Sequence, residues 1–224
     1  MKKAFKDALL RPYYSVRTRL ISWWGGFPLI GVYNGHFFVT YRGIPTFKCP
    51  FDYVMYQMIL SEISPDLVVE IGTNEGGTAL YLADLMDAIG YGTIHTIDIK
   101  DGANETARRH PRIKFFTEGW EKYDLKNGNG FSKILVIDDA SHNHPDTFNA
   151  MKKFAPLISV GSYLIVEDGI VTKLGRDGSL NGGPLRSIHE FLRTDLRFAI
   201  DRKRSDMFGK DSTFNIDGYL KRIK

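Results

Sequence analysis

Five short apolar runs, separated by segments with helical patterning, constrain the fold of this chain more than any other feature. The runs are LVVEI (67–71), TIHTIDI (93–99), RIKFFT (112–117), KILVID (133–138) and SYLIVE (162–167). Between and after them, the pattern predicts helices over 77–88, 103–109, 145–157 and 184–194. Strands that are apolar along nearly their whole length are buried on both faces, which is typical of a parallel sheet covered by helices. The sequence therefore predicts an α/β fold.

The last part of the chain departs from this alternation. RFAID (197–201) and TFNIDGYLKRI (213–223) follow one another with little between them, which predicts an antiparallel closing pair. Five parallel strands plus a C-terminal antiparallel hairpin are the outline of a class I methyltransferase, a Rossmann-like doubly wound sheet. We assign residues 49–224 to this domain, because a chain of 224 residues most simply builds one core.

A basic segment precedes this domain. The first 24 residues hold six Lys and Arg against one Asp, and apolar residues recur there at helical spacing: Tyr13, Val16, Leu20 and Trp23 or Trp24. One reading is a basic amphipathic helix that lies on an anionic membrane surface, here the inner face. The other reading is a helix that packs on the domain, on a second subunit of a homo-oligomer, or over the substrate cleft.

A β-hairpin is predicted over residues 30–48. The runs LIGVY and HFFVTY flank Asn34-Gly35, a strong two-residue turn signal. Together with the basic helix, this hairpin would form an N-terminal element over residues 1–48. From Pro50 the pattern changes to a helix with Tyr53, Tyr56 and Leu60 on its buried face.

Composition excludes several classes of protein. Beyond residue 24 the net charge is about −1, so the folded surface lacks the basic character of a nucleic-acid-binding protein. The apolar stretches are too short to span a membrane, and the start lacks the continuous apolar core of a secretory signal. The single cysteine, Cys49, excludes an intrachain disulfide. We expect a cytoplasmic protein.

The loop after the first apolar run predicts a cofactor site. In VVEIGTNEGG, glycines allow a sharp turn and close approach to a ligand before the helix begins. The spacing differs from the pyrophosphate fingerprint of dinucleotide-binding proteins and better suits the methionine moiety of S-adenosylmethionine. Asp98 closes the second run, where a carboxylate can accept hydrogen bonds from ribose hydroxyls, and Gly119 follows the third, beside the expected adenine. The predicted cofactor-binding residues are Glu70, Gly72, Thr73, Gly76, Gly77, Asp98, Gly119 and Asp138.

This loop also has a simpler interpretation. A glycine-rich turn from strand to helix needs no ligand, and Glu70 can be a helix-capping or solvated carboxylate.

Acidic residues close the fourth and fifth runs, where each strand is expected to leave the sheet. Because the carboxyl ends of neighbouring parallel strands meet at one edge, Asp139, Glu167 and Asp168 are expected to converge there. Three carboxylates at close range repel one another unless a cation binds, and an all-oxygen set suits Mg²⁺. His142 follows Asp139 at three residues and can act as the base, with a surface loop histidine as the alternative. Asp138 is expected to face the cofactor or cap a helix.

On these motifs the chain resembles a known family, the cephalosporin hydroxylase/rhamnosyl O-methyltransferase group, whose relatives include Mg²⁺-dependent macrolide-sugar O-methyltransferases. The resemblance runs from about Tyr41 to the C-terminus. It rests on YRGIPTFKCPFD, PDLVVEIGTNEGGTALYLADL, IDDASH, APLISVGSYLIVEDG and TFNIDGYLKRIK, and on the 28-residue step from Asp139 to Glu167.

The resemblance implies an O-methyltransferase with S-adenosylmethionine as donor, a divalent cation such as Mg²⁺, and a sugar, glycan or glycosylated small molecule as acceptor. It carries the metal carboxylates onto Asp139, Glu167 and Asp168, and the base onto His142. The loop IVTKLGRDGSLNGGP departs from the family pattern, so the identity of the acceptor is the property that the resemblance implies least strongly. Two alternatives stay open: methylation of a catechol-like or other small diol, and a non-catalytic glycan-assembly scaffold.

Overall fold

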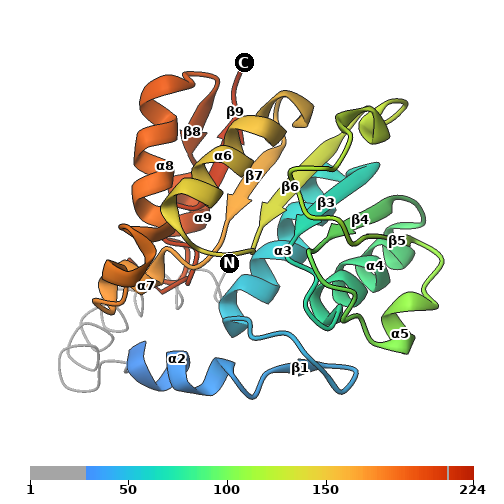
Figure 1. Ribbon diagram of the computed structural model, residues 1–224, viewed down its shortest axis with the longest axis horizontal. Helices are drawn as coiled ribbons and strands as arrows, with labels where there is room; N and C mark the ends of the chain where they lie inside the picture. Colours follow the sequence, from blue (N-terminus) through green and yellow to red (C-terminus); the bar gives the residue numbers. More distant parts are fainter. Residues whose placement is uncertain (1–28, 211) are drawn as a thin grey trace, which may run out of the picture. The chain divides into compact units, whose positions relative to one another are not determined.

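A seven-stranded sheet with helices on both faces forms the body of the protein, seen in the computed structural model in Figure 1. The structure describes residues 29–210 and 212–224. The strand order is β5-β4-β3-β6-β7-β9-β8. The parallel strands are β3 (Leu67–Ile71), β4 (Thr93–Ile97), β5 (Ile113–Phe116), β6 (Ile134–Asp138) and β7 (Tyr163–Val166). The predicted class I arrangement is confirmed.

Two antiparallel strands complete the sheet. β9 (Tyr219–Arg222) pairs with β7 on one side and with β8 (Phe198–Ile200) on the other, antiparallel in both cases. The predicted closing pair is therefore present. β9, the last strand in sequence, lies between β7 and β8, and β8 forms the edge of the sheet. This places the TFNIDGY segment that leads into β9 beside the end of β7.

Alternate residues of the central strands divide the core into two clusters. On β3, Val68 packs with α3 (Pro50–Ile63) and α4 (Gly77–Ile89), whereas Val69 packs with α6 (His144–Phe154) and α8 (Gly183–Thr194). Since successive strand residues point to opposite faces, a strand that is apolar throughout is covered on both sides. Shorter helices are α5 (Glu105–Arg108), α7 (Ile170–Lys173), α9 (Arg202–Ser205) and the 3₁₀ turns Leu125–Gly128, Ala155–Leu157 and Gly178–Leu180.

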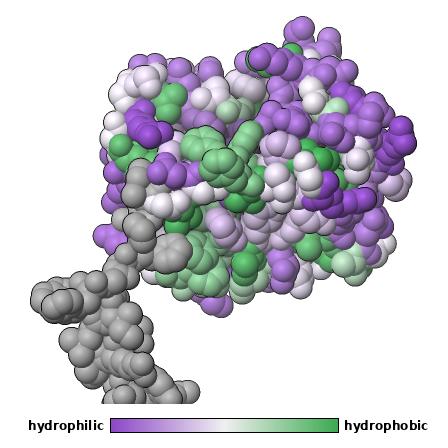
Figure 2. All heavy atoms as spheres, turned by 90° about the horizontal axis from the view of Figure 1, so that it is seen from below, coloured by the Kyte–Doolittle hydropathy of each residue, from purple (hydrophilic) through white to green (hydrophobic). Residues whose placement is uncertain are grey.

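The strand order reverses between β3 and β6. These strands are neighbours, with Ile71 paired to Asp138 at their carboxyl ends, yet β4 follows β3 on the other side. In open parallel sheets, ligands bind outside the carboxyl ends at such a switch point. The carboxyl ends of β6 and β7 point to the lower part of Figure 1, and Figure 2 views the protein from there.

The predicted hairpin over 30–48 is wrong in its first half. Residues Leu29–His36 form helix α2, so LIGVY is helical and Asn34-Gly35 lies in the last turn of that helix. Asn and Gly favour the C-terminal end of a helix as well as a tight turn, and the dipeptide alone does not separate the two. The hairpin that forms is shorter, β1 (Thr40–Tyr41) with β2 (Ile44–Pro45). Its turn, Arg42-Gly43, has positive φ at both residues, as a type I′ turn requires.

The β1–β2 hairpin belongs to the compact unit formed by residues 36–224. There the Tyr41 hydroxyl donates to Asp84 Oδ2 at 2.8 Å, which fixes the hairpin on α4. The predicted basic helix over 13–24, with its membrane or subunit contact, lies outside the described residues, and a homo-oligomer stays a prediction. Among the described residues, every helix is too short or too polar to cross a membrane.

Candidate functional site

The loop between β3 and α4 touches the loop that follows β6. Gly72 has φ +105°, and a Cβ there would overlap the carbonyl group of Asp139, 2.7 Å from its carbon. The Asp139 amide donates to the Ile71 carbonyl at 2.8 Å, and the Gly72 amide donates to Ile97 at 2.8 Å. The predicted cofactor loop and the predicted metal loop therefore meet directly, through backbone atoms that leave no room for a side chain.

The remaining glycines of the cofactor loop lie at its contacts with neighbouring segments. Gly76 precedes the first residue of α4, and Gly77 packs against the β1–β2 hairpin, where a Cβ would lie 2.5 Å from the Pro45 carbonyl oxygen. On the other side, Gly119 has φ +86° and its amide donates to the Asp98 carbonyl at 2.9 Å. The structure thus brings Gly119 next to Asp98, and the adenine role of Gly119 stays a prediction.

Asp98 fixes the shape of the cofactor loop. Its Oδ2 accepts from the amides of Thr73 (3.0 Å) and Asn74 (2.9 Å), and its Oδ1 accepts from the amides of Ile99 (2.7 Å) and Lys100 (3.2 Å). Four backbone donors therefore share the carboxylate predicted to accept ribose hydroxyls. The ribose role stays a prediction, and the structure adds a second role, because Asp98 holds the loop that would carry the ligand.

Two buried carboxyl groups at this edge each have an oxygen without a protein partner. Glu70 Oε2 accepts from the Thr96 hydroxyl at 2.5 Å, but Glu70 Oε1 and Asp138 Oδ2 have no hydrogen-bond partner among the described residues. Buried polar atoms rarely lack a hydrogen-bond partner, so these two oxygens mark positions where a donor group of a ligand fits. Burial raises the pKa of Glu70 to about 8 and that of Asp138 to about 7. A cationic amine would suit both.

The ligand-free protein is expected to lose stability as pH rises because of Glu70. Its pKa is about 8 in the folded protein against an ordinary 4.5, so the folded state favours the protonated carboxyl. This contribution is fully present below pH 4.5 and is lost as pH rises to about 8. Between pH 5.5 and 8.5, the melting temperature of the wild type should fall relative to that of Glu70→Gln by about 5 °C or more. Thermal melts without cofactor measure this. Glu75→Gln, at an exposed carboxylate of the same loop, is the control; equal pH dependence of wild type and Glu70→Gln would contradict the prediction.

Asp139, His142 and Asp168 form a cluster at the ends of β6 and β7. One ligand atom from each lies within 4.8 Å of the others. His142 Nε2 is 3.3 Å from Asp168 Oδ2 and 3.8 Å from Asp139 Oδ1, and all three side chains are about one quarter exposed. His142 and Asp168 have φ +55° and +58°, a strained conformation for such residues that is common at functional sites. Two carboxylates and an imidazole in this arrangement fit a divalent cation or a proton-transfer pair.

Glu167, the third predicted metal ligand, has other partners. Its Oε2 lies 2.5 Å from Lys48 Nζ, and its Oε1 accepts a short hydrogen bond from the Tyr56 hydroxyl. Lys48 Nζ also contacts Asp139 Oδ2, and the lysine is almost completely buried. Burial lowers the pKa of Lys48, but attraction by Asp139 and Glu167 outweighs it, so the pKa is raised and the ammonium is charged. Sequence reasoning missed Lys48 as a site residue.

A buried polar network supports this arrangement from the C-terminal segment. Asp52 accepts from the Tyr219 hydroxyl (2.7 Å), the Phe214 amide (3.1 Å) and the Thr213 hydroxyl. The Asn215 side chain lies 3.4 Å from the Tyr56 hydroxyl, and its Oδ1 accepts from the Asp168 amide at 3.4 Å. The TFNIDGY segment therefore holds both members of the Glu167-Asp168 pair, one through Tyr56 and one through the backbone.

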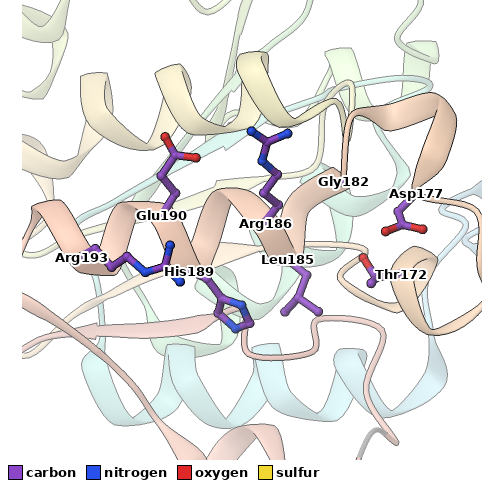
Figure 3. Close-up of a pocket in the computed structure, with 8 residues that line it drawn as sticks. All are labelled: Thr172, Asp177, Gly182, Leu185, Arg186, His189, Glu190 and Arg193. Atoms are coloured by element: carbon purple, nitrogen blue, oxygen red, sulfur yellow. The ribbon is translucent and has the colours of Figure 1, made fainter.

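A groove runs along α8, next to the loop that departs from the family pattern (Figure 3). Its volume is about 480 Å³. Arg186 and Glu190 extend from one side of the helix, and Leu185 and His189 from the other. Among the described residues, no Phe, Tyr or Trp lines it. The groove shares no residue with the acidic cluster. Gly182 lines the groove, and at the next residue, Gly183, a Cβ would lie 3.8 Å from the His142 carbonyl oxygen.

Comparison with known proteins identifies similar sequences over most of the chain. A family model described as rhamnosyl O-methyltransferase/CmcI matches residues 34–223. The chain is 33% identical over 192 residues to the rhamnosyl O-methyltransferase of Mycobacterium bovis (strain BCG / Pasteur 1173P2), which covers 81% of this chain and 77% of that protein. It is 30% identical over 224 residues to the rhamnosyl O-methyltransferase of Mycobacterium leprae (strain TN), and this match covers 95% of this chain and 93% of that protein.

Similar solved structures share the fold. A structure named cmcI-N160 SAH superposes with a TM-score of 0.63 at 23% identity and covers 83% of each chain. A second, named cmcI-D160 Mg-SAM, has a TM-score of 0.61 at 25% identity and covers 83% of this chain and 77% of that one.

Proposed function

The chain belongs to the rhamnosyl O-methyltransferase/CmcI family and is an S-adenosylmethionine-dependent O-methyltransferase; we propose that it methylates a sugar or glycan hydroxyl with the help of a divalent cation. The observation that carries this proposal is the contact between Gly72 and Asp139. It joins the β3–α4 loop, beside two buried carboxyl oxygens that have no partner in the described part of the chain, to a cluster of two carboxylates and an imidazole. A methyl donor and a polar acceptor would each find suitable partners within one edge of the sheet.

The cofactor half is assigned to the residues around the β3–α4 loop. Bound S-adenosylmethionine supplies a methyl group on a positively charged sulfur. Glu70 Oε1 and Asp138 Oδ2 are proposed to accept from its amine, because both are buried without another partner among the described residues. Thr73 and Asp98 hold the loop, and Gly72, Gly76, Gly77 and Gly119 let its backbone approach the ligand.

The acceptor half is assigned to the acidic cluster. Asp139 and Asp168 are proposed to hold the divalent cation, whose charge lowers the pKa of hydroxyl groups near it. His142 is proposed to take the proton from the acceptor hydroxyl at Nε2, the nitrogen that faces Asp168 at 3.3 Å. The carboxylate of Asp168 would stabilise the imidazolium that forms. Alignment of the hydroxyl with the donor methyl supplies much of the remaining rate.

The groove along α8 favours a sugar over a catechol. Charged and hydroxyl-bearing side chains line it, among them Arg186, Glu190 and Thr172, whose hydroxyl oxygen is buried without a partner among the described residues. A hydroxyl-rich acceptor would find many hydrogen-bond partners there, whereas a flat aromatic ring would find no aromatic side chain to stack on. The rhamnosyl acceptors named for the M. bovis and M. leprae proteins have the same chemistry.

Methyl transfer from labelled S-adenosylmethionine to a panel of acceptors tests the function. The panel contains deoxyhexose glycosides, hexose glycosides and a dihydroxybenzoate, each with EDTA and after addition of Mg²⁺ or Mn²⁺. We expect transfer to a glycoside, reduced about 100-fold or more by EDTA and restored by the metal. Preferred transfer to the dihydroxybenzoate would show that the acceptor is a catechol rather than a sugar. Cofactor binding without transfer to any acceptor would favour the scaffold.

A further inference from the structure

The groove along α8 begins beside the acidic cluster. Thr172 lines the groove and belongs to α7, which starts two residues after Asp168. In the loop between α7 and α8, the Asn181 side-chain amide donates to Asn143 Oδ1 at 3.3 Å, and Asn143 directly follows His142. The segments that follow Asp168 and His142 therefore lie at this end of the groove.

From this end the groove extends along the helix. In Figure 3, Thr172 and Asp177 lie near the first turn of α8, and Arg193 lies at the opposite end of the groove. The helix rises about 16 Å between Gly182 and Arg193, at about 1.5 Å per residue, which exceeds the length of one sugar ring. In Figure 1, α8 leads away from the carboxyl ends of β6 and β7. The groove therefore leads from the cluster to a more distant part of the surface.

The side chains of the groove carry balanced charges. Arg186 and Arg193 provide two positive charges, and Asp177 and Glu190 provide two negative charges. Guanidinium groups donate and carboxylates accept, so together they satisfy both hydrogen-bonding functions of a sugar hydroxyl. Leu185 adds an apolar surface on which the C–H groups of a sugar ring can pack. A neutral, hydroxyl-rich ligand fits this lining better than a phosphate or another polyanion, which the two carboxylates would repel.

One sugar ring cannot occupy the cluster and the whole groove together. The groove shares no residue with Asp139, His142 and Asp168, and it extends away from them. A hydroxyl that gives its proton to His142 therefore belongs to a ring at the cluster, and the groove is left for the rings linked to it. We propose that the groove along α8 is a second sugar-binding site, so that the acceptor is a chain of linked sugars rather than a single sugar. The inference rests on the proposed function in assuming that a sugar hydroxyl is methylated at the cluster.

The length of the acceptor tests this inference with the full chain. The acceptors are methyl glycosides of one, two and three linked deoxyhexose units, prepared with each common linkage and assayed with labelled S-adenosylmethionine and Mg²⁺. Binding energy from a remote part of a substrate raises the rate at the reacting centre, so kcat/KM should rise about 10-fold or more from the shortest to the longest acceptor. Equal kcat/KM values for the three lengths, in every linkage, would overturn the inference.

Asp177→Ala and Arg193→Ala locate the added sugars along the groove. Among the described residues, neither side chain forms a hydrogen bond or ion pair with the protein, so both variants should fold like the wild type. We expect Asp177→Ala to lower kcat/KM about 10-fold for the two longer acceptors, and Arg193→Ala to do so for the longest one.

The matched control is Arg109→Ala, at an exposed arginine outside the groove and the cluster. It should keep the wild-type ratio of kcat/KM between the longest and the shortest acceptor. If both groove variants lost as much kcat/KM with the shortest acceptor as with the longest, the groove would act on the reacting sugar itself, and the inference would be overturned.

Binding measured without turnover separates the inference from the proposed function. Saturation-transfer NMR and calorimetry with the longest acceptor require no methyl transfer. Weaker binding of this acceptor to Arg193→Ala, in a protein that transfers no methyl group to any acceptor, would overturn the proposed function and keep the sugar site. Methyl transfer that does not depend on acceptor length would overturn the sugar site alone. Absence of both binding and transfer with every glycoside would overturn both.

Discussion

Replacement of His142 by asparagine is expected to lower kcat for methyl transfer about 10²- to 10⁴-fold, the range for loss of a positioned general base. The imidazole lies 3.3 Å from Asp168 and 3.8 Å from Asp139, beside the carboxylates proposed to hold the cation. The affinity for S-adenosylmethionine should stay within about 3-fold of the wild type, because the proposed cofactor groups, Glu70 and Asp138, are buried side chains of β3 and β6, whereas His142 lies in the loop after β6. Steady-state kinetics and calorimetry measure the two quantities.

Asparagine is the better test residue because His142 has φ +55°. Asn tolerates this left-handed conformation, whereas alanine would add backbone strain to the loss of the ring. The matched control is His110→Asn: His110 also lies between two aspartates, 3.4 Å from Asp84 and 3.2 Å from Asp87, in a cluster outside the site. The control should keep wild-type turnover. Turnover of His142→Asn near the wild-type rate, or loss of cofactor binding, would contradict the assigned role.

The sequence was sufficient for the sheet and for the ends of its strands. The runs at 67–71 and 133–138 are apolar throughout, and their carboxyl ends carry the glycine and acidic residues that a switch point requires. Both signals are local, since burial on two faces excludes polar residues and a close backbone approach needs glycine. The meeting of Gly72 and Asp139 followed from topology, because only parallel neighbours bring these two loops together.

The segment before Pro50 could not be predicted in the same way. LIGVYNGH is compatible with a strand and turn or with a short helix, because apolar residues there lack a clear period of two or of 3.6. The sequence of residues 30–36 therefore does not distinguish a strand from a helix. By contrast, Arg42-Gly43 forms a turn in the structure but lacks the Asn or Asp that usually precedes Gly in a two-residue hairpin turn.

Lys48 was missed because its partners are remote in sequence. It pairs with Asp139 and Glu167 across 91 and 119 positions, and a lysine is normally assigned to the surface. The available signal was its neighbourhood: Lys48 lies between Phe47 and Cys49-Pro50, within a motif that carried the family resemblance. Glu167 and Asp168 were likewise equivalent in sequence, and their environments differ because Lys48 and Tyr56 contact Glu167 whereas His142 lies beside Asp168.

Gly72→Ala is expected to have the largest effect on the folded protein. The methyl group would overlap the Asp139 carbonyl, and φ +105° is unfavourable for any residue with a Cβ. Backbone atoms on both sides are held in the sheet, because Gly72 donates to Ile97 and Asp139 donates to Ile71. The overlap is therefore relieved only by separating the ends of β3 and β6. We expect destabilisation of about 3 kcal/mol or more, a fall in melting temperature of about 6–12 °C, and cofactor affinity reduced at least about 10-fold.

Gly178→Ala is the matched control, since its Cβ would meet no atom within 4 Å and its φ is not positive. It should melt within about 1 °C of the wild type and bind S-adenosylmethionine normally. Calorimetry well below the melting transition of Gly72→Ala then measures binding to folded protein rather than loss of fold. The same displacement moves the Asp139 backbone, so Mn²⁺ affinity should fall together with cofactor affinity in this variant. Normal cofactor and Mn²⁺ binding by Gly72→Ala would mean that the two loops act independently, because a single added carbon cannot leave them both in contact and unchanged.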